Sequence, residues 1–421
     1  MHRIIIAAVL AASTCAQGAR AQTSPPTVAG GTLSLEQALE LASGSVPSIE
    51  GAAAGVRAAE AQRRAAGLRP NPSVNVETEN VVGTGAYSGL SSAETTVGMS
   101  MPIELGGKRS ARIGVADAQI TRARLGTLVA RADLVLRVTQ AFNEAVAADR
   151  RLVVTREQVG IAEEGLRAAR VRVRAGKASP IEEQRAEVAR VNAVNAADRA
   201  DRAVALARGN LGRLIGREPG ALDAGWFDGV GGMGPRVPAT PEGTLALAVA
   251  EAEVGAADAQ VRLARSQRVP DLTLSAGARR LEATNDVAAV FGVSIPIPVF
   301  NNGRANVDAA RAQRDQAQAL GRMARFDAKQ AIAAAETDLA NAEANARTAN
   351  GPALTAAQEA ARIARIGYRE GKFGQLDLLE AERTLAETRG AAIDALAAYH
   401  DAKARLARLT ARAPSAAEIQ P

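Results

Sequence analysis

The chain has 421 residues, a formal net charge of +6 and only 2% aromatic residues. Thick globular cores usually depend on aromatic side chains for buried area, so this composition favours long, alanine-rich helices that pack closely on one another. Arg and Glu alternate along the expected helices, which is typical of a solvated helical surface and argues against nucleic acid as a partner. With two His and one Cys, the sequence offers no cluster for a metal ion or cofactor and no catalytic constellation, so we do not expect an enzyme.

The first residues predict export from the cytoplasm. A short charged start precedes the apolar run 4–12, which is too short to anchor the chain in a bilayer, and the A-x-A sequence at 19–21 offers a cleavage site. Residues 1–21 are therefore interpreted as a secretory signal peptide. Lipidation of Cys15 is the alternative, although the residues before it form a poor lipobox.

The sequence repeats itself at an interval of about half its length. The stretch Val97–Ile103 (VGMSMPI) matches Phe291–Ile297 (FGVSIPI), and a Gly-Lys pair recurs at Gly176 and Gly371. An internal repeat of this kind predicts two structurally similar halves.

Each half is expected to contain short helices, a β-hairpin, a long helix and a further helix after a glycine turn. Residues 106–173 contain no proline, and their apolar positions recur every seven or eight residues, which favours coiled-coil packing. A helix of about 65 residues would be about 100 Å long, so it must pair along its length. The expected segments are a signal peptide (1–21), a first repeat (22–215, with a hairpin at about 72–103 and helices 106–173 and 179–215), a linker (216–240), a second repeat (241–410, with a hairpin at about 270–297 and helices 303–368 and 375–410) and a C-terminal tail (411–421).

Two helix starts carry capping signals. Ser34 with Gln37 forms the sequence pattern of a capping box. In the second repeat, Thr240 followed by Pro241 predicts the start of the counterpart helix, with Thr240 as its N-cap.

Apolar and polar residues alternate in the expected hairpins, as in 97–103 and 291–297. This alternation is typical of barrel strands with lipid outside and water inside, and an ordinary sheet edge packed on a core is the alternative. Two hairpins supply four strands, which cannot close into a barrel, and open edges are not tolerated in lipid. If these strands span a membrane, several copies of the chain must share one barrel.

A motif after each hairpin predicts a corner between strand and long helix. Pro102 should end strand pairing, and the glycines should turn the chain. A basic residue at a helix N-terminus opposes the helix dipole, so Lys108 is expected to pair with Glu104 or with lipid phosphates. The expected corner residues of both repeats are Pro102, Gly106, Gly107, Lys108, Pro296 and Gly303.

This layout resembles the TolC family of outer-membrane efflux channels from Leu35 to about Thr410, and residues 102–109 (PIELGGKR) are similar to the heavy-metal, CzcC-like branch. The resemblance implies a mainly α fold with a small membrane β part. Three chains would form a transmembrane β-barrel, with four strands from each, which continues as a long α-helical coiled-coil barrel across the periplasm.

The resemblance also implies where the functional residues lie. In that family the helical turns face the periplasm, dock an adaptor protein and carry acidic rings at the channel entrance. The implied adaptor-docking residues are Gly176, Lys177, Tyr368, Gly371 and Lys372. The implied pore-entrance residues are Glu182, Asp377 and Glu380. Threefold repetition would make each carboxylate a ring that favours cations, and ordinary surface charge is the alternative.

The implied function is a passive duct for heavy-metal cations from the periplasm to the exterior. The implied partners are two further copies of the chain, a periplasmic adaptor (membrane fusion) protein, an inner-membrane RND-type pump and outer-membrane lipid. A periplasmic coiled-coil adaptor or scaffold without a pore, and a TolC-like channel for drugs or secreted proteins, remain as alternatives. An exported hydrolase lacks support because no nucleophile or carboxylate pocket is found. His400 is interpreted as a residue of the last helical turn.

Overall fold

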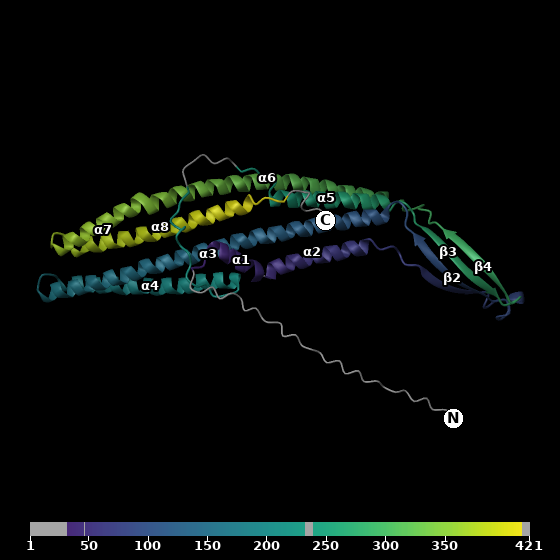
Figure 1. The fold of residues 1–421 in the computed structure, drawn as a ribbon, viewed down its shortest axis with the longest axis horizontal. Helices are drawn as coiled ribbons and strands as arrows, with labels where there is room; N and C mark the ends of the chain where they lie inside the picture. Colours follow the sequence, from purple (N-terminus) through teal and green to yellow (C-terminus); the bar gives the residue numbers. More distant parts are fainter. Residues whose placement is uncertain (1–31, 46, 232–238, 415–421) are drawn as a thin grey trace, which may run out of the picture.

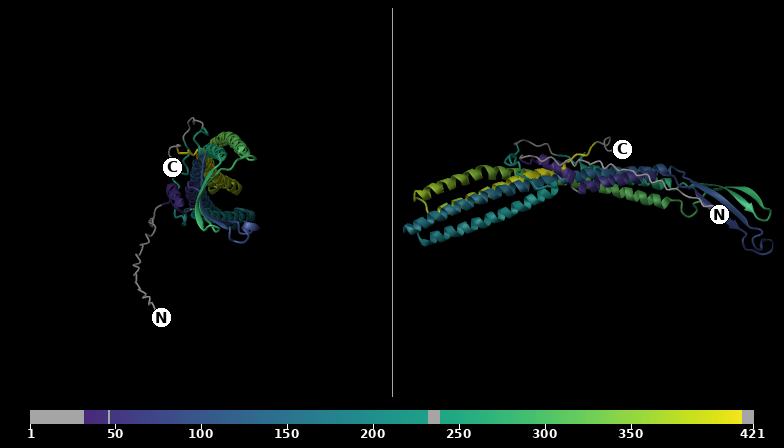
Figure 2. Two further views of the ribbon diagram at one scale, coloured as in Figure 1. Left: turned by 90° about the vertical axis from the view of Figure 1, so that its right-hand side faces the viewer. Right: turned by 60° about the horizontal axis from the view of Figure 1, so that its bottom comes forward.

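A computed structural model describes residues 32–231, except residue 46, and residues 239–414. The molecule is a long rod whose helices run along its axis, with one small sheet at one end (Figures 1 and 2). The prediction of a mainly helical chain with four strands is confirmed. The expected signal peptide lies outside the described residues, as do residues 232–238 of the expected linker and 415–421 of the expected tail. Within the described ranges, no helix combines the length and apolar composition needed to cross a membrane.

The elements follow one another in the order of two repeats. The first repeat contains α1 (Leu35–Ser45), α2 (Pro47–Ala66), β1 (Ser73–Glu79), β2 (Glu94–Ile103), α3 (Lys108–Arg174) and α4 (Pro180–Ile215). The second repeat contains α5 (Leu245–Ser266), β3 (Leu272–Leu281), β4 (Asp286–Ser294), α6 (Arg304–Thr348), α7 (Leu354–Arg369) and α8 (Gln375–Leu409).

The longest helix is uninterrupted in one repeat and broken in the other. Helix α3 runs for 67 residues because no proline interrupts it. Its counterpart is divided into α6 and α7 by a π-helical segment, Ala349–Ala353. There Gly351 has non-helical angles (φ −110°, ψ −107°), and Pro352 has no N–H for the helical ladder.

The capping signals are correct for one helix start and wrong for the other. Ser34 N–H donates to Gln37 Oε1 (3.1 Å) and Gln37 N–H donates to Ser34 Oγ (3.2 Å), which confirms the expected capping box. Thr240 caps no helix, because residues 241–243 form a turn and α5 begins after Thr244. Among the described residues, the second repeat therefore has one helix before its strands, where short helices in the plural were expected.

Helix α3 connects the two repeats. It packs against α2 and α4 of its own repeat and against α5 and α8 of the other. Helix α6 packs on α5 and α8, and α7 packs on α8. As a result, the hairpins α3–α4 and α7–α8 both turn at the end of the rod that is farthest from the sheet (Figure 1).

The four strands form one antiparallel sheet in the order β1–β2–β3–β4, so β2 of the first repeat pairs with β3 of the second. Val74, Met99 and Phe291 lie in one row across the sheet, and each is more than half exposed. The opposite face carries Ser, Asn and Glu side chains and glycines, as the alternation predicts. Strands β1 and β4 have one unpaired edge each in the single chain.

The main core lies near the middle of the rod, where residues 216–231, here called the strap, cross the helices. Phe227 of the strap is fully buried with Phe142 of α3, and Tyr399 of α8 is 2% exposed beside them. Tyr399 also accepts the Gly231 N–H through its hydroxyl (2.9 Å). This part of the expected linker is therefore a packed element of the core.

His400 belongs to this core, and its assignment to the last helical turn is wrong. It lies nine residues before the end of α8 and is 8% exposed. Its Nε2 donates to the Phe227 carbonyl (2.8 Å), and burial lowers the pKa of the imidazole. The ring is therefore a neutral packing residue at neutral pH.

Candidate functional site at the helical tips and the strand-to-helix corner

Both helical hairpins turn on a glycine with a left-handed backbone. Gly176 and Gly371 have φ values of 66° and 73°. Past each glycine a lysine N–H closes the helix end: Lys177 N–H donates to the Arg172 carbonyl (2.9 Å), and the Lys372 N–H makes the equivalent bond (2.8 Å). These are Schellman caps, which explains why the Gly-Lys pair recurs in the sequence. Both glycines and both lysines are exposed at the tips.

The second tip is packed more tightly than the first. The Phe373 ring lies against Gly367 of α7, where a Cβ would overlap the ring. The position equivalent to Gly367 in the first repeat is Arg172. The two tips therefore have the same backbone conformation but different side chains on their surfaces.

Two contacts join the two hairpins just behind the tips. The Arg172 guanidinium lies over the Tyr368 ring, 5.0 Å from its centroid, and its Nε is 3.8 Å from the Glu182 carboxylate. Gln375 Nε2 donates to the Glu182 carbonyl (2.9 Å). Burial raises the pKa of Tyr368, which is 8% exposed, so its hydroxyl stays protonated. Tyr368 thus lies between the hairpins, apart from the exposed tip lysines.

The three expected entrance carboxylates have different surroundings. Asp377 is exposed in the first turn of α8, where its Oδ2 accepts the Gly374 N–H (2.9 Å). Glu380 is exposed one turn further along the same helix. Glu182 is partly buried beside Arg172. The structure therefore brings Asp377 and Glu380 together and leaves Glu182 in the contact between the hairpins.

The strand-to-helix corners also depend on left-handed glycines. Gly106, Gly107 and Gly303 have φ values of 70°, 72° and 72°. A Cβ on Gly106 would lie 2.6 Å from Val269, so this position allows no side chain. In addition to this overlap, the left-handed backbone conformation itself is unfavourable by about 1–2 kcal/mol for a residue with a side chain.

The two prolines of the corners have different places. Pro102 does not end strand pairing: it lies opposite Thr273 inside β2, and the β2–β3 ladder continues to Ile103. Pairing with β1 has already stopped at Ser100, so only one neighbour strand remains at this point. Pro296 lies two residues beyond the end of β4.

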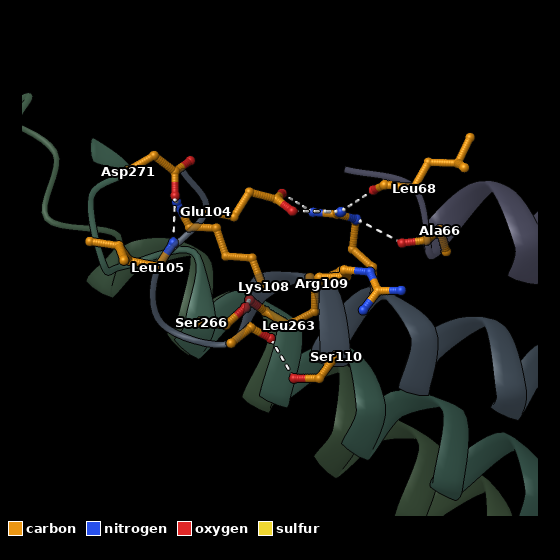
Figure 3. A network of polar contacts seen from close by, with 12 residues as sticks. Ala66, Leu68, Glu104, Leu105, Lys108, Arg109, Ser110, Leu263, Ser266 and Asp271 are labelled. Carbon is orange, nitrogen blue, oxygen red and sulfur yellow. Dashed lines mark hydrogen bonds and ion pairs between the residues drawn. The ribbon is translucent and has the colours of Figure 1, made fainter. Parts of the chain in front are cut away.

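Asp271 of the second repeat fixes the start of α3 (Figure 3). Lys108 Nζ lies 2.7 Å from Asp271 Oδ1, and the Leu105 N–H donates to the same oxygen (3.1 Å). Burial raises the pKa of Asp271, but the hydrogen bonds from Lys108 and Leu105 outweigh it and the pKa is lowered. The expected Lys108–Glu104 pair is therefore wrong, because β2–β3 pairing brings Asp271 to the helix start.

Glu104 is bound instead by Arg112, one turn into α3. Both oxygens of the carboxylate contact the guanidinium, which lowers the pKa of Glu104. The same guanidinium donates to the carbonyls of Ala66 (3.3 Å) and Leu68 (3.2 Å) at the end of α2 (Figure 3). Arg112 thus clamps α2, the end of β2 and α3 together.

Metal coordination finds no support in this geometry. Across residues 32–231 and 239–414, leaving aside residue 46, no group of three or more His, Cys, Asp or Glu is arranged to hold a metal ion. What the candidate site offers is exposed charge, turns and contacts between helices.

A family model for the outer membrane efflux protein matches residues 38–217 and 242–412. The chain belongs to this family. The two matched ranges correspond to the two structural repeats and leave the strap largely between them.

Two curated relatives of this outer membrane efflux protein come from Cupriavidus metallidurans. The chain is 33% identical over 403 residues to the cobalt-zinc-cadmium resistance protein CzcC, covering 92% of each chain. It is 35% identical over 286 residues to the nickel and cobalt resistance protein CnrC, covering 68% of this chain and 67% of the relative. Among solved structures, a membrane protein from Pseudomonas aeruginosa has the same fold, with a TM-score of 0.75, 21% identity and coverage of 90% of each chain.

Family membership gives the two ends of the rod a location. An outer membrane efflux protein lies in the outer membrane and extends into the periplasm with its helices. The sheet is then the membrane end, and the helical tips are the periplasmic end (Figure 1). Adaptors and pumps are partners of such channels in general.

Proposed function

We propose that three copies of this chain form a channel that exports heavy-metal cations from the periplasm through the outer membrane. The observation that carries this proposal is the sheet with one apolar and one polar face and two unpaired edges, β1 and β4. Unpaired backbone groups are not tolerated in lipid, so the edges must pair with other copies. Twelve strands from three chains close such a sheet, with the apolar face toward lipid and the polar face toward the lumen.

The charge of the polar face favours cations as cargo. Across β1, β2 and the start of β4 this face carries Glu77, Glu79, Glu94 and Asp286. Arg279 shares the face and contacts Glu94 (2.7 Å) and Glu79 (2.9 Å). Carboxylates outnumber the cation, and rings of carboxylates are a common device of cation channels. The names of the relatives, cobalt-zinc-cadmium and nickel-cobalt resistance proteins, agree with divalent cations.

At the periplasmic end the exposed tips are the surface for an adaptor, and the adaptor links the channel to an inner-membrane pump. Gly176 and Gly371 keep the turns narrow, and Lys177 and Lys372 supply positive charge that suits an acidic adaptor surface. Asp377 and Glu380 form the entrance rings, since both are exposed at the start of α8.

Deletion of the gene, with complementation, tests this function. Cells without the channel should retain cobalt, zinc or cadmium and grow poorly in their presence, while their tolerance of organic drugs stays unchanged. Complementation with the wild-type chain should restore export. A loss of drug tolerance with normal metal tolerance would favour a drug channel. Purified protein that remains monomeric without detergent would contradict the channel altogether.

A further inference from the structure

A cavity of about 430 Å³ lies beside the strap and is lined by residues of α1, α3 and α8. This volume is typical of sites for small molecules. Most of the wall is apolar and comes from Leu35, Val135, Leu136 and alanines of α3 and α8, and Trp226 of the strap completes it. All of these residues belong to one chain.

Two polar side chains of the cavity wall, Asn143 and His400, lie at one end of the cavity. Asn143 of α3 is 3% exposed, and neither its Oδ1 nor its Nδ2 has a hydrogen-bond partner among the described residues. His400 lies at the same end and uses its Nε2 for the Phe227 carbonyl (2.8 Å). A buried amide without partners is unfavourable, so Asn143 in a cavity wall indicates a ligand with a polar group.

A positive charge stands beside this polar end. Lys403 follows His400 by one helical turn on α8 and lines the same cavity. Its amine makes no ion pair within the part of the chain that the structure describes. The other cation of the wall, Arg408, is already paired with Asp133 (2.6 Å). The cavity therefore has one uncompensated cation next to its unpartnered amide.

The rest of the cavity suits an alkyl chain. From Asn143 it extends along α3 to Ala132, about 16 Å at the rise of a helix. On the other side it continues past Ala404 and Ala407 of α8 to Ala411 just beyond this helix, and the one charged side chain of this stretch, Arg408, is paired with Asp133. A polar, positively charged end followed by a mostly apolar stretch is complementary to an anionic head with a single alkyl chain.

We propose that this cavity binds a single-chain alkyl carboxylate. The carboxylate lies against the Asn143 amide and the Lys403 amine, and the alkyl chain lies between α3 and α8 toward Ala411. Trp226 covers the ligand from the side of the strap.

Trp226 provides the measurement, because it is the only tryptophan of the chain. Full-length protein in phosphatidylcholine nanodiscs is titrated with sodium octanoate, and Trp226 emission and the thermal unfolding midpoint are followed. Emission should change with saturation, and the midpoint should rise, because a ligand that binds only the folded state stabilises it. Octylamine has an alkyl chain of the same length and the opposite charge, and butyrate has a shorter chain. Each should bind at least tenfold more weakly than octanoate.

Two variants locate the ligand. Asn143→Leu and Lys403→Gln should each weaken octanoate binding about tenfold, since each removes one contact with the carboxylate. Lys329→Gln, on the exposed surface of α6 and outside the cavity, serves as the matched control and should bind like the wild type. The Asn143→Leu change keeps the branched shape and the number of heavy atoms of the side chain, and Lys403 is exposed, so both variants should fold.

Three results would overturn the proposal. A change in emission that never saturates means that octanoate does not occupy a site. An equal response to octylamine means that only apolar contact is measured. Wild-type affinity in both cavity variants means that the ligand binds elsewhere.

Discussion

The Arg365 guanidinium makes a bidentate ion pair with the Glu382 carboxylate across the α7–α8 hairpin, and the Glu382 side chain is only 7% exposed. At the equivalent positions of the first repeat, Arg170 lies 3.5 Å from Glu187 across α3–α4, but that carboxylate is 34% exposed. The duplication has thus preserved one ion pair in both hairpins and buried it in only one.

Replacing Glu382 with Gln should destabilise the protein by about 1–3 kcal/mol, because a largely buried carboxylate loses its charge while Arg365 keeps its own. The exposed fraction of Arg365 keeps the loss below that of a fully buried pair. Glu187→Gln is the matched control and should have a clearly smaller effect. Thermal unfolding followed by circular dichroism measures both, and equal shifts would show that burial does not separate the two pairs.

Gly367→Ala should lower the unfolding midpoint, although alanine is the better helix former. The new methyl group would displace the Phe373 ring, and such overpacking costs about 1–3 kcal/mol. Gly390→Ala in α8 has open space around its Cβ and should instead gain about 1 kcal/mol of helix propensity. A stabilised Gly367→Ala variant would mean that the ring moves aside freely.

The repeat explains what could be predicted from the sequence. Matching stretches revealed both hairpins and both Gly-Lys turns, because these features occur twice and have local causes. The contacts that join the repeats occur once. Asp271 reaches Lys108 only because β2 pairs with β3, and Arg172 meets Tyr368 at positions whose repeat equivalents are a glycine and a valine.

The burial of the strap was equally inaccessible to pattern analysis. Gly- and Pro-rich sequence predicts a loop, and much of the strap has no regular secondary structure. Its largest fully buried side chain, Phe227, packs in the core with residues of α3 and α8, and the Phe227 carbonyl accepts a hydrogen bond from the His400 imidazole. A lone histidine on a helix gives no sign of such a partner.

The corner should make the stability of the protein sensitive to acid. The pKa values of Glu104 and Asp271 are lowered from ordinary values of 4.5 and 3.8. The stability that these two carboxylates contribute is therefore fully present at a pH above these ordinary pKa values. It is lost as the pH falls through the lowered pKa values of the folded state. Thermal midpoints should fall between about pH 5 and pH 2, and the decline should be shallower in Asp271→Asn.

The control for this experiment is Asp308→Asn on α6, which removes an exposed carboxylate paired within one helical turn. Its acid sensitivity should equal that of the wild type, since exposed pairs contribute little. An Asp271→Asn variant with an unchanged pH profile would show that the Lys108 contact does not stabilise the folded corner.

The entrance carboxylates should decide the ion selectivity of the assembled channel. Asp377 and Glu380 are exposed one turn apart at the start of α8, and in a trimer each would occur three times around one axis. Carboxylates that converge on an axis attract cations. In planar bilayers, the double variant Asp377→Asn with Glu380→Gln should lose cation preference, and block by added divalent cations should weaken.

Two comparisons make the entrance experiment specific. Glu387→Gln removes a carboxylate from the same helix, where it pairs with Arg383, and should leave selectivity unchanged. Added salt should reduce the wild-type preference, because exposed charges are screened over about 8–10 Å at about 0.1–0.15 M. Asn at position 377 still accepts the Gly374 N–H, so the helix start is retained and the change in selectivity reports charge alone. Unchanged selectivity and cation block in the double variant would assign Asp377 and Glu380 to ordinary surface charge and move the entrance to other residues.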